Sequence, residues 1–514
     1  MAQIKVIRSF WLIALFILPF SLIKAQETES GGKKKIEILH ADIMSNRGEM
    51  RQLLGDVRFK HKETYMICDS AHFYPRRNLV KAYSKVHIYK GDTLHLYGEY
   101  LLYNSEDEYA YVTDSVILID NQTTLYTDYI EYDMVEETAT YTSGGKIINE
   151  DNVLTSMIGI YHTESEIFNF KDSVILVNPD YKMYSDTLEY NTTNEIAYFL
   201  GPSEVIGDSL YVRCKRGWYD TKNEVSLLLD DAFIDNETQI VTGDSLYYES
   251  DNGFGTAYYN VTITDKEQDI IVKGNESWYY RDPERFMITD SAQFIQVNDD
   301  DYLYLHADTL RSVTVTDTAM SYRLVRAFYG CRVYSEDLQA KCDSLAYSFR
   351  DSVIHMYYEP VLWSESYQLF ADSMALLTKN REMHKMELYN NSFVIEEVDS
   401  TRYNQLKGKN LFGYFKDNKL YKIEIRGNAE KIYFAIEENE LVGVDHSTCV
   451  NMDIYITDGK ISEIYMIDNP EGTLDPPLYH MPSLRRLENF NWYNAIRPKN
   501  RFDIFRGNSN THLH

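Results

Sequence analysis

An internal repeat of about 29 residues is the feature that most constrains how this chain of 514 residues can fold. The segments 66–73, 96–103 and 125–132 align without gaps, and each has an acidic residue at its fourth position, which we call the anchor. The anchor position recurs at Asp69, Glu99, Asp128, Met157, Asp186, Lys215, Asp244, Asn275, Asp308, Asp343, Asp372 and Lys409. Because a repeat of this length is typical of proteins built from stacked units, the sequence predicts one array over residues 36–470.

The repeat also predicts a change of backbone direction at each anchor. Three residues before the anchor every copy has an apolar residue, and one residue before it every copy has a small one. Four residues after the anchor most copies have an aromatic residue, usually tyrosine. Alternate residues of a strand share a face, but the step from position −1 to position +2 is odd, so the apolar side must change at the anchor. A β-bulge or a bend is therefore expected there, where Asp and small residues are common.

The composition favours strands over helices. The chain has 44 tyrosines, together with many Val, Ile, Thr and Phe residues, all of which are enriched in strands. A second strand pattern recurs between the anchors, for example in the segments 82–88, 110–118 and 257–263. We therefore predict an all-β, elongated repeat fold with at least two strands per repeat. The periodicity alone leaves open whether the inner apolar columns form a filled solenoid core or line a groove.

The N-terminal segment 1–25 predicts export. It has a basic start, an apolar stretch from Phe10 to Ile23 and a small residue, Ala25, at the expected cleavage site. This pattern is typical of a secretory signal peptide, and the apolar stretch is shorter than the roughly 20 residues that a membrane-spanning helix needs.

The C-terminal segment 471–514 has a different character from the array, because it contains prolines and is rich in basic and aromatic residues. Two interpretations stay open. The segment could dock on an anionic partner or a lipid headgroup, or it could cap the open face of the last repeat. The candidate docking residues are Arg485, Arg486, Trp492 and Arg497.

The repeated elements resemble a known family. The pattern apolar-x-Ala-Asp-x-apolar, seen in Leu305–Leu310 and Leu369–Met374, alternates with a Gly-x-Val-x-apolar pattern such as Gly55–Phe59. This alternation resembles the OstA-like (organic solvent tolerance, LptA-type) domain of lipopolysaccharide transport, over residues 36–470, as one long run or as two tandem units.

The resemblance implies a β-jellyroll of antiparallel strands with a V-shaped cross-section, whose apolar interior shelters the acyl chains of lipid A. It implies lipopolysaccharide as the ligand and the periplasm, in association with the outer membrane, as the location. It also implies docking to other lipopolysaccharide-transport components through edge strands, and head-to-tail self-association. The residues that it places in a lipid-binding groove, which are equally interpretable as packed core, are Leu96, Leu125, Leu154, Met183, Val212, Val241, Val272, Leu305 and Leu369.

The charge and the motifs exclude several other functions. A formal net charge of −28 argues against a protein that follows nucleic-acid phosphates. No spacing typical of a catalytic or metal site is present, so we predict no enzymatic activity, metal or cofactor. The Asp-rich stretches Leu229–Asp231 and Asn298–Asp301 are expected to be solvated turns rather than calcium sites. Two alternatives stay open: a structural or adhesive surface rod, and an enzyme with a cleft where the repeat loosens between Asn275 and Asp343.

Five cysteines are present in a chain expected to reach an oxidising compartment. Cys68, Cys214 and Cys342 occupy the same small position in distant repeats, so no bridge is expected among them. Cys331 and Cys342 are close enough in sequence for a local pair, a question that the sequence leaves open. Cys449 is expected to be free.

Overall fold

A computed structural model describes residues 35–92, 94–106, 108–120, 123–149, 151–298, 301–316, 321–379, 382–416, 419–437, 440–457, 460–476 and 486–506. The predicted signal peptide, Arg485 and the acidic residues 299 and 300 lie outside the described residues. The chain divides into two compact units, unit 1 (Met1–Asn252) and unit 2 (Gly253–His514), which are described separately.

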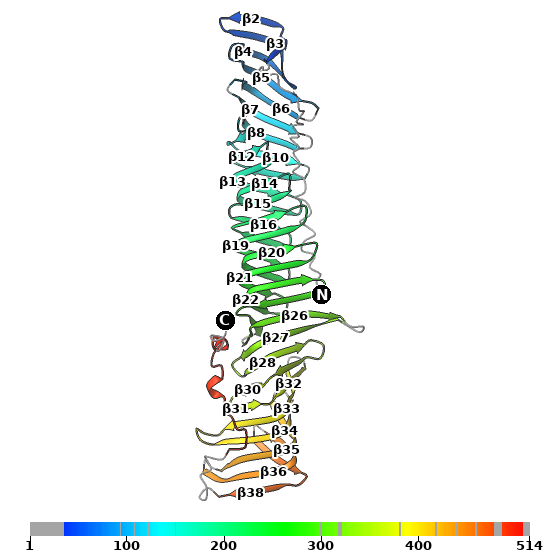
Figure 1. Cartoon of the computed structure of the whole chain (residues 1–514), viewed down its shortest axis with the longest axis vertical. Coiled ribbons are helices and arrows are strands. Elements are labelled where there is room, and N and C mark those ends of the chain that lie inside the picture. The colour runs from blue at the N-terminus through cyan, green and yellow to red at the C-terminus, as the bar shows by residue number, and fades with distance from the viewer. Residues whose placement is uncertain are drawn as a thin grey trace, which may run out of the picture. The chain divides into compact units, whose positions relative to one another are not determined.

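The described residues form antiparallel strands that follow one another hairpin by hairpin (Figure 1). Unit 1 contains β1 (Glu37–His40), β2 (Ile43–Arg47), β3 (Met50–His61), β4 (Thr64–Tyr74), β5 (Leu79–Lys90), β6 (Leu94–Asn104), β7 (Tyr109–Asp120), β8 (Thr123–Asp133), β9 (Thr138–Tyr141), β10 (Gly145–Asn149), β11 (Asn152–Ser156), β12 (Ile158–His162), β13 (Ile167–Val177), β14 (Tyr181–Asn191), β15 (Ile196–Phe199), β16 (Ser203–Gly207), β17 (Leu210–Cys214), β18 (Arg216–Asp220), β19 (Val225–Asn236) and β20 (Gln239–Glu249).

Unit 2 contains β21 (Phe254–Asp265), β22 (Ile270–Arg281), β23 (Glu284–Thr289), β24 (Gln293–Asn298), β25 (Asp301–His306), β26 (Thr309–Thr316), β27 (Ser321–Tyr334), β28 (Gln339–Ser348), β29 (Val353–Tyr357), β30 (Val361–Ser364), β31 (Tyr367–Phe370), β32 (Ser373–Lys379), β33 (Glu382–Glu397), β34 (Tyr403–Lys416), β35 (Lys419–Glu437), β36 (Glu440–Thr457), β37 (Lys460–Ile467), β38 (Glu471–Asp475) and two short 3-10 helices, η3 (Asn494–Ile496) and η4 (Asp503–Phe505). The all-β prediction is confirmed. Within the described ranges, no helix is both long enough and apolar enough to cross a membrane.

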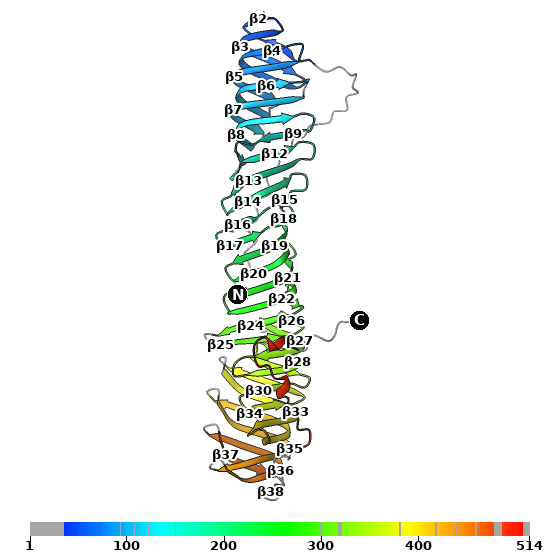
Figure 2. The same cartoon turned by 90° about the vertical axis from the view of Figure 1, so that its left-hand side faces the viewer.

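The bend predicted at the anchor is also confirmed. Where β7 pairs with β8, the register shifts because the anchor Asp128 stands opposite two residues, Asp114 and Ser115. Both of these residues have positive φ, 64° and 57°. The same shift occurs at the anchors of β4 and β6, and such an extra residue bends the strand that carries it. The bent strands are visible in the side view of Figure 2.

The repeat pattern did not predict the conformation of the residues that face the anchors. They are pairs with positive φ that recur at nearly the same period: Ser84–Lys85, Asp114–Ser115, Asp172–Ser173, Asp230–Asp231, Tyr259–Asn260 and Asp290–Ser291. Their frequent Asp, Asn and Ser residues tolerate this conformation better than most. The stretch Leu229–Asp231 is thus part of a bulge, where Asp230 forms an ion pair with Arg216 (2.6 Å) and Asp231 forms one with Lys215.

The bends divide each unit into two half-sheets whose inner faces pack together. Half-sheet A contains the strand segments that precede the anchors and their pairing partners, and half-sheet B contains the segments that follow the anchors. In the β7–β8 hairpin, half-sheet A holds residues 116–120 and 123–127, and half-sheet B holds residues 109–113 and 129–133. The alternation of the strand is clear from burial, since Leu125 is 9% exposed and its neighbour Tyr126 is 43% exposed.

The small residue before each anchor is required by close packing at the bend. A Cβ atom on Gly98 would lie 2.5 Å from a methyl group of Val112, and one on Gly274 would lie 2.6 Å from Ile288. Real side chains do not approach so closely, so a larger residue would push the two half-sheets apart.

Side-chain hydrogen bonds join successive repeats at the outer end of half-sheet B. Three threonine hydroxyls donate to the backbone carbonyl of a glutamate 26 residues earlier: Thr163 to Glu137 (2.9 Å), Thr192 to Glu166 (3.0 Å) and Thr221 to Glu195 (2.8 Å). These glutamates have positive φ, which turns their carbonyls toward the next repeat. The bonds fix the spacing of neighbouring hairpins.

Candidate functional site

The predicted groove residues of unit 1 lie in a continuous apolar row on the inner face of half-sheet A, which we call the unit 1 row. Each member of the row is the direct pairing partner of the next across the strands. The row consists of Phe59, Met66, Ile88, Leu96, Leu118, Leu125, Ile147, Leu154, Leu176, Met183, Val205, Val212, Ile234 and Val241. At about 4.8 Å between paired strands, it is roughly 60 Å long.

Sequence reasoning identified only part of this row. It placed Leu96, Leu125, Leu154, Met183, Val212 and Val241 there, because they precede the anchors by three residues. The members that alternate with them come from the second strand of each repeat, for example Ile88, Leu118, Ile147 and Leu176. Their signal was the short alternating apolar pattern between anchors.

One hollow between the half-sheets of unit 1 has a volume of about 60 Å³, enough for a few water molecules. Its lining comes from both half-sheets: Leu118, Asp120, Thr123, Leu125, Ile130, Ala139, Tyr141, Ile147, Gly159, Ile160, Tyr161, Phe168 and Phe170. The rings of Tyr161 and Phe168 are stacked, with their centroids 4.1 Å apart.

Neutral polar residues border the unit 1 row on half-sheet A. The side-chain amide of Asn149 donates to the Thr123 hydroxyl (3.0 Å), and the amide of Asn178 donates to the Asn152 carbonyl oxygen (2.8 Å). All four residues are buried. Buried polar groups need hydrogen-bond partners, and these uncharged side chains supply them to one another beside the apolar row.

Tyrosines border the interior on half-sheet B, at the position four residues after the anchor. The hydroxyl of Tyr103 is 2.6 Å from Nδ1 of His61, so this hydrogen bond joins half-sheet B to half-sheet A. Burial raises the pKa of Tyr190, at the same repeat position, to about 12. Burial also raises the pKa of Tyr141 to about 12. These hydroxyls are therefore neutral at physiological pH.

A corresponding row in unit 2, the unit 2 row, is apolar only over part of its length. Its apolar members are Ile263, Val272, Phe294, Leu305, Val333, Ala340, Leu362, Leu369, Val394 and Leu406. The next two positions are Lys431 and Ser447. The side chain of Lys431 is 4% exposed and forms an ion pair with Asp445. The apolar surface of this unit therefore ends in an ion pair between the buried Lys431 and the partly exposed Asp445.

The three predicted groove residues of unit 2 lie in this row. Leu305 and Leu369 are buried, and Val272 is partly exposed. In unit 1, Leu96 and Val241 are likewise partly exposed, and the other four predicted residues are buried. The structure thus places all nine on one kind of inner face, and brings them together as two rows rather than one pocket.

The tail residues 486–506, which we call the strap, lie against the outer face of half-sheet A in unit 2 (red in Figure 1). Gln368 donates its amide to the Asn491 carbonyl (2.7 Å) and accepts the Tyr493 amide on its side-chain oxygen (2.7 Å). Gln405 accepts the Leu487 amide (2.8 Å). Gln368 and Gln405 are fully buried, and their side chains bind the backbone of the extended strap through specific hydrogen bonds.

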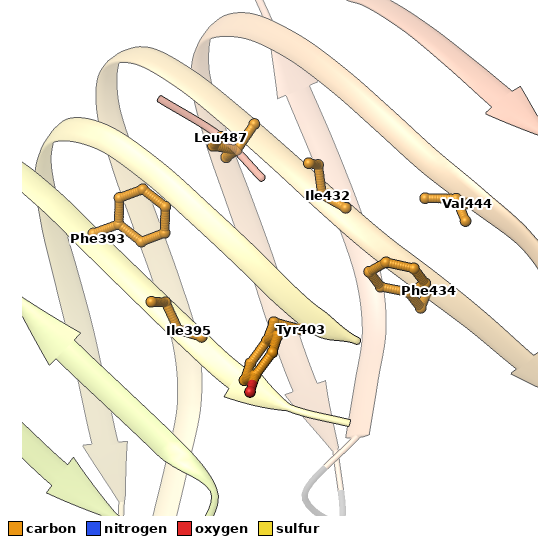
Figure 3. Close-up of a cluster of buried hydrophobic side chains, with 7 residues drawn as sticks. All are labelled: Phe393, Ile395, Tyr403, Ile432, Phe434, Val444 and Leu487. Carbon is orange, nitrogen blue, oxygen red and sulfur yellow. The ribbon is translucent and has the colours of Figure 1, made fainter. Parts of the chain in front are cut away.

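A second hydrophobic core forms beneath the strap. It consists of Phe393, Ile395, Tyr403, Ile432, Phe434, Val444 and Leu487 (Figure 3). Phe490 and Trp492 pack against it, with ring centroids 5.5 Å and 5.1 Å from that of Tyr403. The strap therefore covers an outer sheet face that would otherwise present several large apolar side chains to water.

The predicted docking residues that the structure describes all contact this same unit. The Arg486 guanidinium lies over the ring of Tyr403, 4.6 Å from its centroid. Arg497 donates to the side-chain oxygen of Gln339 (2.8 Å) and to the carbonyl of Glu365 (2.9 Å). Trp492 belongs to the core beneath the strap. Docking to another molecule stays a prediction, and these three side chains are engaged within the chain.

No arrangement for metal chemistry is seen in the part of the chain that the structure describes, where no group of three or more His, Cys, Asp or Glu side chains is placed to hold an ion. Residues 33–186 match the model of the OstA-like protein family. This region is OstA-like. It contains the unit 1 row from Phe59 to Met183 and the first five anchors, so the resemblance seen in the repeats is supported there. No curated protein matches the chain.

Proposed function

We propose that this protein is an exported, non-enzymatic carrier of lipopolysaccharide in the periplasm, which shields the acyl chains of lipid A on the inner face of half-sheet A and bridges the inner and outer membranes. The observation that carries the proposal is the unbroken apolar row of unit 1 within and beyond the OstA-like region. Burial of each acyl CH₂ group contributes about 0.8 kcal/mol. A continuous apolar row would therefore keep the acyl chains out of water along its whole length, and no covalent reaction is needed for the lipid to move.

The small volume of the hollow determines how a lipid would enter. About 60 Å³ does not accommodate an acyl chain, so binding requires the half-sheets to separate along the edge where Tyr103 meets His61. Tyr103 and His61 can exchange this hydrogen bond for bonds to water or to a lipid headgroup when the edge opens.

Edge strands in each unit support docking to other transport components or to a second copy. Ile43 and Met44 on β2 are 59% and 51% exposed. Tyr465 on β37 and Leu474 on β38 are 52% and 70% exposed. An open strand edge with exposed apolar side chains can pair with a strand of another chain.

Site-specific photocrosslinking in living cells tests the proposal. A photoreactive residue is placed at Leu125, at Val212 or at Leu305, and at Tyr126 as the outward-facing control. Lipopolysaccharide adducts at the three inner positions, and none at Tyr126, are expected. Absence of adducts at all four positions in a well-expressed, exported protein would contradict the carrier function.

A second candidate is a structural or adhesive surface rod, which the small volume of the hollow favours. This alternative predicts that the half-sheets stay together permanently. The two functions differ in the same experiment, because a rod gives no adducts at the inner positions.

A further inference from the structure

Cys331 and Cys342 are the one pair of cysteines that stand opposite each other among the described residues. They are direct pairing partners in the antiparallel pair β27–β28, and each is 1% exposed on the inner side of the bend. The other cysteines face different residues: Cys68 faces Val57, Cys214 faces Ser203 and Cys449 faces Ala429.

The separation of the pair suits a disulfide. Directly opposed residues of antiparallel strands have Cα atoms about 4.5–5.5 Å apart, which is within the range of about 4.4–6.8 Å that disulfides span. In the structure both side chains are free thiols. The Cys331 thiol donates to the Asp343 carbonyl (3.3 Å), which keeps its sulfur beside the strand that carries Cys342.

We propose that Cys331 and Cys342 form a cross-strand disulfide in the mature protein. This inference rests on the proposed export, because disulfides persist in oxidising compartments and rarely in the cytoplasm. Both thiols lose a proton and the pair loses two electrons as the sulfur–sulfur bond forms. The acceptor is the disulfide of an envelope dithiol oxidoreductase, which is reduced to its dithiol.

The exchange takes place before β27 and β28 are fully packed. One cysteine thiolate attacks the donor disulfide to give a mixed disulfide, and the other cysteine then displaces the donor thiol. A hydrogen bond with the Cys331 side chain, followed by burial, raises the pKa of the Cys342 thiol far above its usual value in the folded protein. The folded dithiol is therefore a poor nucleophile, and the folded disulfide is protected from reduction.

The disulfide would join β27 to β28 covalently beside the bend. Cys331 follows the positive-φ pair Tyr329–Gly330, and β27 also contacts η4 of the strap. The bond closes a loop that includes the short turn between β27 and β28. It therefore fixes the register of the two strands in a part of unit 2 where the repeat is longer than 29 residues.

Thiol counting on the exported full-length chain tests this inference. The protein is recovered from the cell envelope, denatured with a maleimide present, and weighed by mass spectrometry with and without prior reduction. Three labelled thiols without reduction and five after it are expected, with a peptide containing Cys331 linked to one containing Cys342. A Cys342→Ser variant should show four labelled thiols before and after reduction, and the control Cys214→Ser should show two before and four after.

The outcomes separate the inference from the function on which it rests. Five labelled thiols in the envelope fraction, without reduction, would overturn the disulfide and leave export intact. Recovery of the chain only in the cytoplasm would overturn the proposed export, and the disulfide with it.

Discussion

Half-sheet A is used differently in the two units. In unit 1 its inner face is apolar along the whole row, and on its outer face Tyr97, Tyr126 and Tyr184 are 37–43% exposed. In unit 2 the inner row ends at the buried Lys431, and the strap covers the part of the outer face where Gln368 and Gln405 lie, whereas Tyr302 on β25 is 46% exposed. The same repeat thus supports a one-sided sheet in unit 1 and, beneath the strap of unit 2, a sheet buried on both faces.

This difference shows which part of the repeat is structural and which part is free to specialise. Both units keep the bend and the small residue before the anchor, since the half-sheets cannot pack without them. The outer positions of half-sheet A differ, because nothing in the stacking of strands constrains them. The glutamines at positions 339, 368 and 405 each precede an anchor by four residues and bind the strap, one per repeat.

Removal of the strap should produce the largest effect, and only in unit 2. Deletion from Arg486 onward removes the hydrogen bonds that three buried glutamines make to the strap, at a cost of about 1 kcal/mol each, and exposes the apolar core beneath. We expect a loss of about 5 kcal/mol in the stability of β31–β36, measured by hydrogen exchange of backbone amides. Exchange in unit 1 should be unchanged. Equal loss in both units would contradict the division described above.

A full-length double variant, Gln368→Leu with Gln405→Leu, removes the hydrogen bonds to the strap while the strap segment itself stays in the protein. It should reproduce most of the destabilisation, because the backbone groups of Leu487, Asn491 and Tyr493 lose their partners. The matched control is Gln268→Leu in an exposed turn, which should have little effect.

Substitution at Lys431 tests whether the charge pair is a required end of the unit 2 row. Lys431→Met leaves the carboxylate of Asp445 without its cation in a mostly buried site, and should destabilise unit 2 by about 3 kcal/mol. Chemical denaturation measures the change. Addition of Asp445→Leu should recover most of the loss and extend the apolar row, and failure to recover would indicate another role for the pair.

Truncation within the unit 1 row should cost less than loss of the strap and more than any change on the outer face. Leu154 is 1% exposed, so Leu154→Ala should destabilise unit 1 by about 3 kcal/mol. Tyr126→Ala, on the outer face, should cost under about 1 kcal/mol. Similar costs for the two variants in thermal unfolding would mean that the inner and outer faces are not distinguished.

High pH should weaken unit 1 by an amount that is smaller, for each buried tyrosine, than the cost of Leu154→Ala. The pKa of Tyr141 is about 12 in the folded protein and 10.0 in its ordinary state, and burial also raises the pKa of Tyr190 to about 12. A raised pKa means that the folded state holds its proton more tightly, so stability is full below pH 10 and declines up to about pH 12. Circular dichroism during alkaline titration should detect a decline of about 2 kcal/mol per tyrosine, and Tyr141→Phe should reduce it.

The inner face of the array was predictable from the sequence because apolar columns and an odd step between them specify which side of a strand is buried. Leu125, Leu154 and Met183 are buried on the inner face for that reason, and their role in a lipid groove stays a prediction. The seat of the strap was not predictable, since Gln368 and Gln405 look like ordinary exposed residues and their burial depends on a segment more than 80 residues away. The positive-φ pairs were missed because their residue types vary more than those of the anchors.

The amount of lipid bound to the purified protein tests the central claim most directly. The protein is isolated from the cell envelope in mild conditions and examined by native mass spectrometry, together with the variants Leu125→Asn and Tyr126→Asn. The carrier account predicts bound lipopolysaccharide in the unmodified chain, a strong reduction with Leu125→Asn and no reduction with Tyr126→Asn. A stable, exported protein with no bound lipid, or equal binding by the two variants, would contradict it.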